Sequence, residues 1–398
     1  MATVPSTTVQ SDLVPRLSKQ GYDAQSVATR RRWLEEKTGC HLKQIGTYSI
    51  PSQDMKGNVE NPVGAVQTPL GVAGPLQVNG IHARGVFYVP LATTEGALVR
   101  SYERGMMTLT RCGGVSARVE LDENCVAPIF FFEDVSAAHD FAGSIFGQFD
   151  SIRVEAEATT QHGKLLRIEP QVVGRSVMLS FHYHTGDAHG MNMIVKATEH
   201  ACQWIMKCSL AMSYYIFSGM ESEKRASGFL FRGGKGKKVV AGARLSSEIL
   251  RSHLRATPAQ FADLWRHTVV GHLQANAIGY NGHLANGLAA LFIACGQDVG
   301  NLPNCAVGIT NFEVTEDGSL YASVTLSSLT VATVGGGTGL GTSHECLQML
   351  GCAGTGFAPK LAEIFAATLL AGELSIAAAI VSGEFVAAHE TYGRKRPT

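Results

Sequence analysis

The stretch 183–193, YHTGDAHGMNM, gives the first information about the fold class of this chain. Gly186 and Gly190 lack a Cβ, so a ligand can approach the backbone closely, and Asp187 and Asn192 offer groups that form hydrogen bonds. The stretch lacks the Gly-x-Gly-x-x-Gly pattern of a Rossmann turn. It therefore predicts either a polar-ligand loop of another kind or an ordinary connection between two elements.

The composition of the whole chain is that of a globular protein. The chain has 398 residues, of which 45% are hydrophobic and 17% charged, enough for one large domain or for two or three smaller ones. Lysine plus arginine and aspartate plus glutamate both total 33, so the net charge is zero. A neutral chain gives no indication of nucleic acid or an anionic membrane surface as the main partner.

The location of the protein is predicted from its cysteines and its apolar segments. Nine cysteines without a Cys-x-x-Cys pair favour buried free thiols in a reducing compartment. The N-terminus lacks the basic and apolar regions of a signal peptide. The most apolar segment, 364–381, contains Gly372 and Glu373 and predicts a buried helix rather than a membrane span. We expect a cytoplasmic protein.

Hydrophobic patterning predicts alternating strands and helices on either side of the opening stretch. Strands are expected at 116–121, 127–132, 151–158 and 176–183, with helices near 135–146 and after Met191, which indicates a compact α+β insert. Elsewhere we expect a charged helix at 29–37, a hairpin around Asn79-Gly80, helices at 258–278, 283–296 and 359–389, and a strand pair within 306–334.

Four polar residues together have the chemistry that carbonyl reduction needs. Glu95 lies at a predicted helix start with Thr94 as N-cap, Lys224 in a charged loop, Asp298 after an apolar helix, and His389 at the end of the last helix. A lysine can stabilise an oxyanion, a carboxyl can donate a proton, and a histidine can protonate a leaving group. Each residue also has an ordinary structural interpretation, as a cap, a solvated charge, a turn residue or a surface histidine.

Three further patterns are weaker. The run 233–237, GGKGK, lacks the Gly-Lys-Ser/Thr ending of a phosphate loop and predicts a solvated basic turn. The run 335–338, GGGT, allows either close backbone approach or a bulge. His182, His184 and His189 have no neighbouring cysteine and no acid besides Asp187, so we expect no metal site.

Several motifs in one order resemble the catalytic part of the 3-hydroxy-3-methylglutaryl-CoA reductase family. They are, in chain order, Glu60–Gly64 with Gly71–Leu76, Thr93–Val99, Gly186–Met193, Ser218–Lys224, His283–Asn286 with Ile293–Asp298, and Gly335–Thr338 with Leu347–Gly351.

The resemblance implies an α+β fold with a large helix-centred substrate domain and a small inserted dinucleotide-binding domain that is not a Rossmann domain. The large domain, at 55–126 plus 217–398, would bind acyl-CoA; the small α+β domain, at 127–216, would bind NADPH or NADH; and 1–54 would form an N-terminal arm and helical segment. It also implies a homodimer or a dimer of dimers with shared active sites.

The resemblance further implies a role for each site residue. Lys224 would polarise the thioester carbonyl, Asp298 would hydrogen-bond Lys224 and Glu95, Glu95 would donate a proton, and His389 would protonate the departing CoA thiolate. Two hydrides would take the thioester through a hemithioacetal and an aldehyde to mevalonate. The expected cofactor residues are Asp187, Gly190, Met191, Asn192, Gly336 and Gly337, and the expected substrate residues are Ser218, Arg225, Arg266 and Asn286.

The chain departs from the family pattern at several of these places. Val126 stands where the family has an arginine for the substrate carboxylate, and His189 stands where methionine is usual. Glu223 replaces an aspartate before the catalytic lysine, in a loop that is one residue shorter. Two alternatives therefore stay open: reduction of a different acyl-CoA thioester, or a non-catalytic paralogue that binds CoA or nucleotide.

Overall fold

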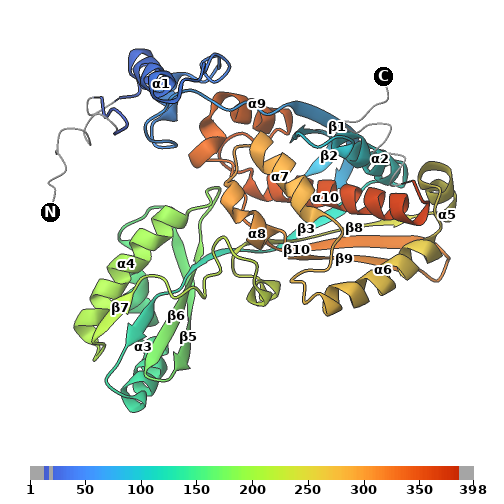
Figure 1. The fold of residues 1–398 in the computed structure, drawn as a ribbon. Coiled ribbons are helices and arrows are strands. Elements are labelled where there is room, and N and C mark those ends of the chain that lie inside the picture. The colour runs from blue at the N-terminus through green and yellow to red at the C-terminus, as the bar shows by residue number, and fades with distance from the viewer. Residues whose placement is uncertain (1–12, 18–20, 385–398) are drawn as a thin grey trace, which may run out of the picture.

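The computed structural model describes residues 13–17 and 21–384, and Figure 1 shows their arrangement. The helices are α1 (Ala24–Thr38), α2 (Leu98–Arg111), α3 (Val135–Glu157), α4 (Met191–Cys208), α5 (Ser247–Ile249), α6 (Pro258–Gln274), α7 (Leu284–Ala294), α8 (Leu302–Cys305), α9 (Gly341–Met349) and α10 (Ala358–Val381). The strands are β1 (Leu70–Asn79), β2 (Arg84–Ala92), β3 (Ser116–Val126), β4 (Ile129–Phe131), β5 (Lys164–Val173), β6 (Ser176–His184), β7 (Ser213–Tyr215), β8 (Gly236–Leu245), β9 (Gly308–Val314) and β10 (Leu320–Leu329). The predicted α+β class is confirmed.

One long strand, β3, connects the two parts of the molecule. Its first part, Ser116–Glu123, pairs with β8, and its last part, Asn124–Val126, pairs with β6. The sheet order is β7-β4-β6-β3-β8-β10-β9, with β5 on the other side of β6, and all these pairs are antiparallel. In Figure 1, β3 passes from the part that contains α10 into the part that contains α3 and α4.

The smaller part has its own hydrophobic core. Helices α3 and α4 pack against each other, and α3 packs on β5, around buried residues that include Val126, Phe130, Phe181 and Ile194. The strand predicted at 151–158 is wrong, because these residues form the second half of α3. Ile152 and Ala156 are buried while Val154 is 66% exposed, which is the spacing of one helix face. Strand β5 was not predicted.

Helix α10 forms the centre of the larger part. It contacts α2, α7, β8, β10 and β3, and the predicted burial of this segment is confirmed. By length and composition alone it could cross a membrane, but 83% of its most apolar window is buried inside the fold, as in the core helix of a globular protein. Gly105 of α2 allows the close crossing, since a Cβ there would lie 2.0 Å from the Ala371 carbonyl oxygen.

Two buried acids on α10 fix loops of the larger part. Glu363 accepts hydrogen bonds from the backbone N–H groups of Ile81, His82 and Ala83 in the β1–β2 turn. Glu373 accepts them from Gly282 and His283, directly before α7. These donors compensate the burial of the carboxylates, so the apolar helix also sets the position of α7.

Most predicted elements of the larger part are confirmed, with two corrections at helix ends. Helix α2 begins at Leu98, after Ala97 with a φ of 71°, so Thr94 is not its N-cap. Helix α10 ends at Val381, because Ser382 and then Gly383, with a φ of 74°, end the helix; residues 385–389 of the predicted range lie outside the described residues.

Candidate active site

An ion pair between Lys224 and Asp298 lies at the centre of the candidate site. Lys224 belongs to the loop between β7 and the 3-10 turn Gly228–Arg232, and its Nζ lies 2.9 Å from Oδ2 of Asp298. Both side chains are about half exposed, at 51% and 45%. Asp298 also accepts a hydrogen bond from the backbone N–H of Gly300, at 2.9 Å. Although burial raises the pKa of Asp298, the Lys224 ammonium and the Gly300 N–H hold this pKa below its usual value.

A second pair joins Glu95 to the start of α7. The side-chain amide of Asn286 donates to Oε1 of Glu95 at 3.3 Å, and the Glu95 backbone N–H donates to the Thr93 hydroxyl at 3.0 Å. The buried Glu373 fixes the backbone that precedes Asn286. Within residues 13–17 and 21–384, no hydrogen bond joins Glu95 to Asp298, so of the two expected Asp298 contacts the structure shows only the one to Lys224.

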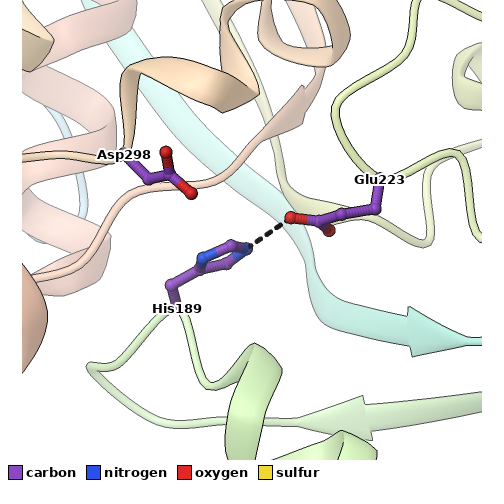
Figure 2. A group of neighbouring side chains, drawn as sticks. All are labelled: His189, Glu223 and Asp298. Carbon is purple, nitrogen blue, oxygen red and sulfur yellow. Dashed lines mark ion pairs between the residues drawn. The ribbon is translucent and has the colours of Figure 1, made fainter. Parts of the chain in front are cut away.

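A third group of charged side chains lies beside this pair, and its members come from distant segments. Glu223 forms an ion pair with Nζ of Lys235, and Nε2 of His189 lies 3.8 Å from Oε1 of Glu223. Figure 2 shows His189, Glu223 and Asp298 converging, with the dashed line between His189 and Glu223. Burial lowers the pKa of His189 in spite of the nearby Glu223 carboxylate, which favours the neutral imidazole at neutral pH.

These three side chains have the donor types of a metal site, but their charges are already compensated. Each of His189, Glu223 and Asp298 offers one ligand atom, and these three atoms lie within 4.8 Å of one another. The ammonium groups of Lys235 and Lys224 contact the two carboxylates. A divalent cation would bring a further positive charge next to two lysines, so we assign no metal to this group.

The opening stretch lies at the junction of β6, α4 and α10. The Asp187 carboxylate accepts hydrogen bonds from the backbone N–H groups of Gly356, at 2.7 Å, and Ala358, at 3.0 Å, directly before and at the start of α10. Gly190, with a φ of 74°, is the N-cap of α4 and supplies no side-chain cap. Asn192 is exposed and Met191 is half-buried.

The glycine run that follows β10 contributes an open backbone surface. Gly336 begins the 3-10 turn Gly336–Gly339, and a Cβ on Gly336 would meet no heavy atom within 4 Å. Gly337 packs against Gly296, since a Cβ on Gly296 would lie 2.3 Å from the Gly337 carbonyl oxygen. The run is therefore tied to the turn that precedes Asp298.

The remaining expected residues lie in different places and do not form one group. The Ser218 N–H donates to the Ala127 carbonyl at 2.8 Å, which holds the start of the Lys224 loop. Arg225 is exposed and lies 3.4 Å from Glu221, and Arg266 pairs with Asp263 on its own helix, α6. His389 lies outside the described residues.

The most informative residue that sequence reasoning missed is Lys235. The predicted solvated turn at 233–237 is wrong, because Lys235 and Lys237 are only 1% and 3% exposed. Lys237 pairs with Asp122 at 2.7 Å. The signal available in the sequence was the three glycines around Lys235. In the structure they have φ values of 84°, 95° and 79° and bring the backbone close to its neighbours.

Comparison with known proteins identifies the family of this chain. The family described as hydroxymethylglutaryl-coenzyme A reductase matches residues 26–394. The chain belongs to this family. It is 43% identical over 373 residues to the 3-hydroxy-3-methylglutaryl-coenzyme A reductase of Methanocaldococcus jannaschii, covering 92% of each chain. It is 41% identical over 380 residues to the enzyme of Haloferax volcanii, covering 94% of each.

A solved structure shares the fold at much lower identity. The class II 3-hydroxy-3-methylglutaryl-CoA reductase of Streptococcus pneumoniae, in a structure described as bound to NADPH in open conformations, matches with a TM-score of 0.68. The match has 18% identity and covers 92% of this chain and 100% of the other. Within a hydroxymethylglutaryl-CoA reductase fold, Val126 is fully buried in the core of the smaller part.

Proposed function

We propose that this chain reduces 3-hydroxy-3-methylglutaryl-CoA to mevalonate and CoA with two equivalents of NADPH or NADH. The observation that carries the proposal is the Lys224–Asp298 pair, which lies in a chain that matches the reductase family over residues 26–394. An ammonium on a partly exposed loop, held by a carboxylate, can reach a substrate carbonyl and stabilise the oxyanion that forms when the carbonyl is reduced.

The other expected catalytic residues complete the proposed chemistry. Asp298 would keep Lys224 protonated and oriented, since the lowered pKa of Asp298 keeps this carboxylate ionised at neutral pH. Glu95, oriented by Asn286, would donate the proton to the carbonyl oxygen. His389 would protonate the departing CoA thiolate.

The residues of the opening stretch fit a dinucleotide. Gly190 leaves the first N–H groups of α4 without a side-chain cap, and such a helix start accepts a phosphate. Gly186 and Gly336 leave open space beside the backbone. The reduced nicotinamide supplies hydride when it is bound. Gly190, Met191, Asn192, Gly336 and Gly337 would bind it, and Asp187 would hold the loop against α10 through its carboxylate.

Ser218, Arg225, Arg266 and Asn286 remain our proposed substrate residues. Arg225 supports the proposal best, because its guanidinium is 62% exposed on the same loop as Lys224 and can pair with a carboxylate. We also propose the division into domains at 55–126 plus 217–398 and at 127–216, supported by the two separate hydrophobic cores.

We propose a homodimer or a dimer of dimers in the cytoplasm. Leu70, Val72, Val86 and Tyr88 on the β1–β2 pair are 46–57% exposed, which leaves apolar surface for a second copy. Six of the nine free cysteines are buried as predicted, whereas Cys40 and Cys208 are exposed, and free thiols support a reducing compartment. Analytical ultracentrifugation tests the assembly, and a monomer at micromolar concentration would contradict it.

The activity is tested by following the absorbance of NADPH and of NADH with 3-hydroxy-3-methylglutaryl-CoA. Two equivalents of cofactor consumed for each mevalonate formed support the proposal, and no oxidation of either cofactor rejects it. Any function that survives Lys224→Ala is not this reduction, which separates the enzyme from a non-catalytic paralogue.

One observation favours keeping a second candidate, the reduction of a different acyl-CoA. Val126 is fully buried and apolar, so position 126 supplies no cation for a substrate carboxylate. A panel of CoA thioesters tests this candidate. A higher kcat/KM for a thioester without the second carboxylate would support it, and a clear preference for 3-hydroxy-3-methylglutaryl-CoA would exclude it.

A further inference from the structure

The turn that carries Lys224 has an unfavourable backbone conformation. Ser222 has a φ of 51° and Lys224 a φ of 57°, so two residues with side chains lie in the left-handed region on either side of Glu223. Neither is glycine, and each is disfavoured there by contacts of its Cβ. Such a turn persists only when its surroundings fix it.

The backbone–backbone hydrogen bonds of the turn are long. The N–H of Ser222 donates to the Gly219 carbonyl at 3.3 Å, and the N–H of Arg225 donates to the Ser222 carbonyl at 3.3 Å. The Lys224 side chain is half exposed, so its pair with Asp298 is screened by water. These contacts are weak compared with a fully buried interaction.

Within the loop, the buried Glu221 carboxylate accepts a hydrogen bond from the Gly219 N–H at 3.0 Å, and the Glu223 side chain supplies the buried contact to another segment. Its carboxylate forms an ion pair with Lys235, whose side chain is 2% exposed, while the Glu223 side chain is 15% exposed. The Lys235 ammonium also donates to the Cys125 carbonyl at 3.2 Å and lies 3.5 Å from Sδ of Met191. Loss of the carboxylate would leave a buried ammonium without a counter-charge, a penalty of the same order as the strain of two left-handed residues.

The length of the acid matches the length of the loop. In the family motif that this loop resembles, we expect an aspartate at this position and a loop that is one residue longer. Here the loop is shorter, and the carboxylate lies one carbon–carbon bond, about 1.5 Å, further from its backbone. The longer side chain thus reaches Lys235 from a shorter turn.

We infer that Glu223 is a positioning residue: its buried contact with Lys235, flanked by His189, holds the strained Ser222–Lys224 turn and thereby aims Lys224 at Asp298. The inference rests on the proposed function for the role of Lys224. The anchor is built from both parts of the molecule, because His189 and Met191 come from the smaller part and Glu223 and Lys235 from segments outside it.

The test compares Glu223→Asp with a variant that also restores the longer loop. We expect Glu223→Asp to lower kcat about tenfold or more, with KM for both substrates within about threefold, because the misplaced amine stabilises the transition state less. Insertion of one glycine between Met220 and Glu221 in the Glu223→Asp chain should restore kcat to within about threefold of wild type. A wild-type kcat for Glu223→Asp, or no recovery on insertion in a folded protein, overturns the inference.

Lys237→Met is the matched control. Lys237 is similarly buried and pairs with Asp122 rather than with Glu223. We expect Lys237→Met to lower the midpoint temperature of thermal unfolding, while kcat stays within about twofold of wild type. An equal loss of kcat in Lys237→Met and Glu223→Asp would mean that general destabilisation causes the effect, and this also overturns the inference.

A readout without turnover separates this inference from the proposed function. The acetylation rate of Lys224 with acetic anhydride, followed by mass spectrometry, should rise about threefold in Glu223→Asp as the amine leaves Asp298, and should fall again on glycine insertion. An unchanged rate overturns the inference. Wild-type protein that oxidises no cofactor rejects the proposed function and leaves the labelling result to decide the position of Lys224.

Discussion

Two lysine–carboxylate pairs lie side by side in this molecule, and they differ in exposure. Lys224 and Asp298 are 51% and 45% exposed, whereas Lys235 and Glu223 are 2% and 15% exposed. The exposed pair is available to a substrate and contributes little to stability, because water screens it. The buried pair is closed to a substrate, and each partner needs the other. With Lys224 in its proposed role, reactivity and anchoring are divided between adjacent residues, Lys224 and Glu223.

The largest expected effect comes from removing the exposed amine. Lys224→Met should lower kcat by about 10³-fold, since the oxyanion loses its main stabilising charge. Steady-state kinetics with the preferred cofactor measures the loss. The free energy of unfolding should change by less than about 1 kcal/mol, because the pair with Asp298 is half exposed. A kcat close to wild type would remove Lys224 from the proposed chemistry.

Removing the buried amine should instead act on stability. Lys235→Met leaves the Glu223 carboxylate buried without its counter-charge, so we expect a loss of about 3 kcal/mol in the free energy of unfolding, measured with urea. The double variant Lys235→Met/Glu223→Gln should regain part of this loss, because no unpaired charge remains. A single variant as stable as wild type would show that the buried pair does not act as an anchor.

Replacement of Asp187 tests whether the loop between β6 and α4 is held by the start of α10. Asp187→Ala removes the acceptor for the N–H groups of Gly356 and Ala358 and should lower the free energy of unfolding by about 1 kcal/mol. Asp187→Asn keeps one acceptor oxygen and should lose less. Equal stability of the alanine variant and wild type would contradict a structural role for this carboxylate.

The smallest expected effect is the pH dependence that arises from Asp298. The folded-state pKa of Asp298 is lowered from 3.8, so its contribution is fully present above this value and is lost as the pH falls through the folded pKa. Asp298→Asn should therefore be less stable than wild type above pH 4 by less than about 1 kcal/mol, and the gap should close below pH 3.8. Urea midpoints across this pH range measure the gap. A gap that widens in acid would contradict the lowered pKa.

Long helices and hairpins were predictable, because local pattern and burial coincide in them. The run 359–389 predicted α10 as a buried helix, and Asn79-Gly80 predicted the β1–β2 turn. Residues 151–158 were predicted as a strand because Ile152, Val154 and Ala156 alternate with polar residues. Only packing against β5 and α4 shows that the buried spacing is helical.

The candidate site was predictable in part. Lys224 and Asp298 were expected to meet, and Asn286 was expected near the substrate. That Asn286 contacts Glu95 and that His189 lies beside Glu223 depend on how α7 and the β6–α4 loop are placed in space. No periodicity or spacing carries this information, because the partners are separated by long stretches of chain.

The sequence by itself determined the family, the α+β class, and the residue types that the chemistry needs, since these depend on ordered motifs and local patterns. Only the tertiary structure decided which charges are buried. Lys235, in a glycine-rich run that looks solvated, became an internal counter-charge because β3 and the α4 loop close over it. Burial is a property of the whole fold, and burial distinguishes an ordinary surface lysine from an anchor.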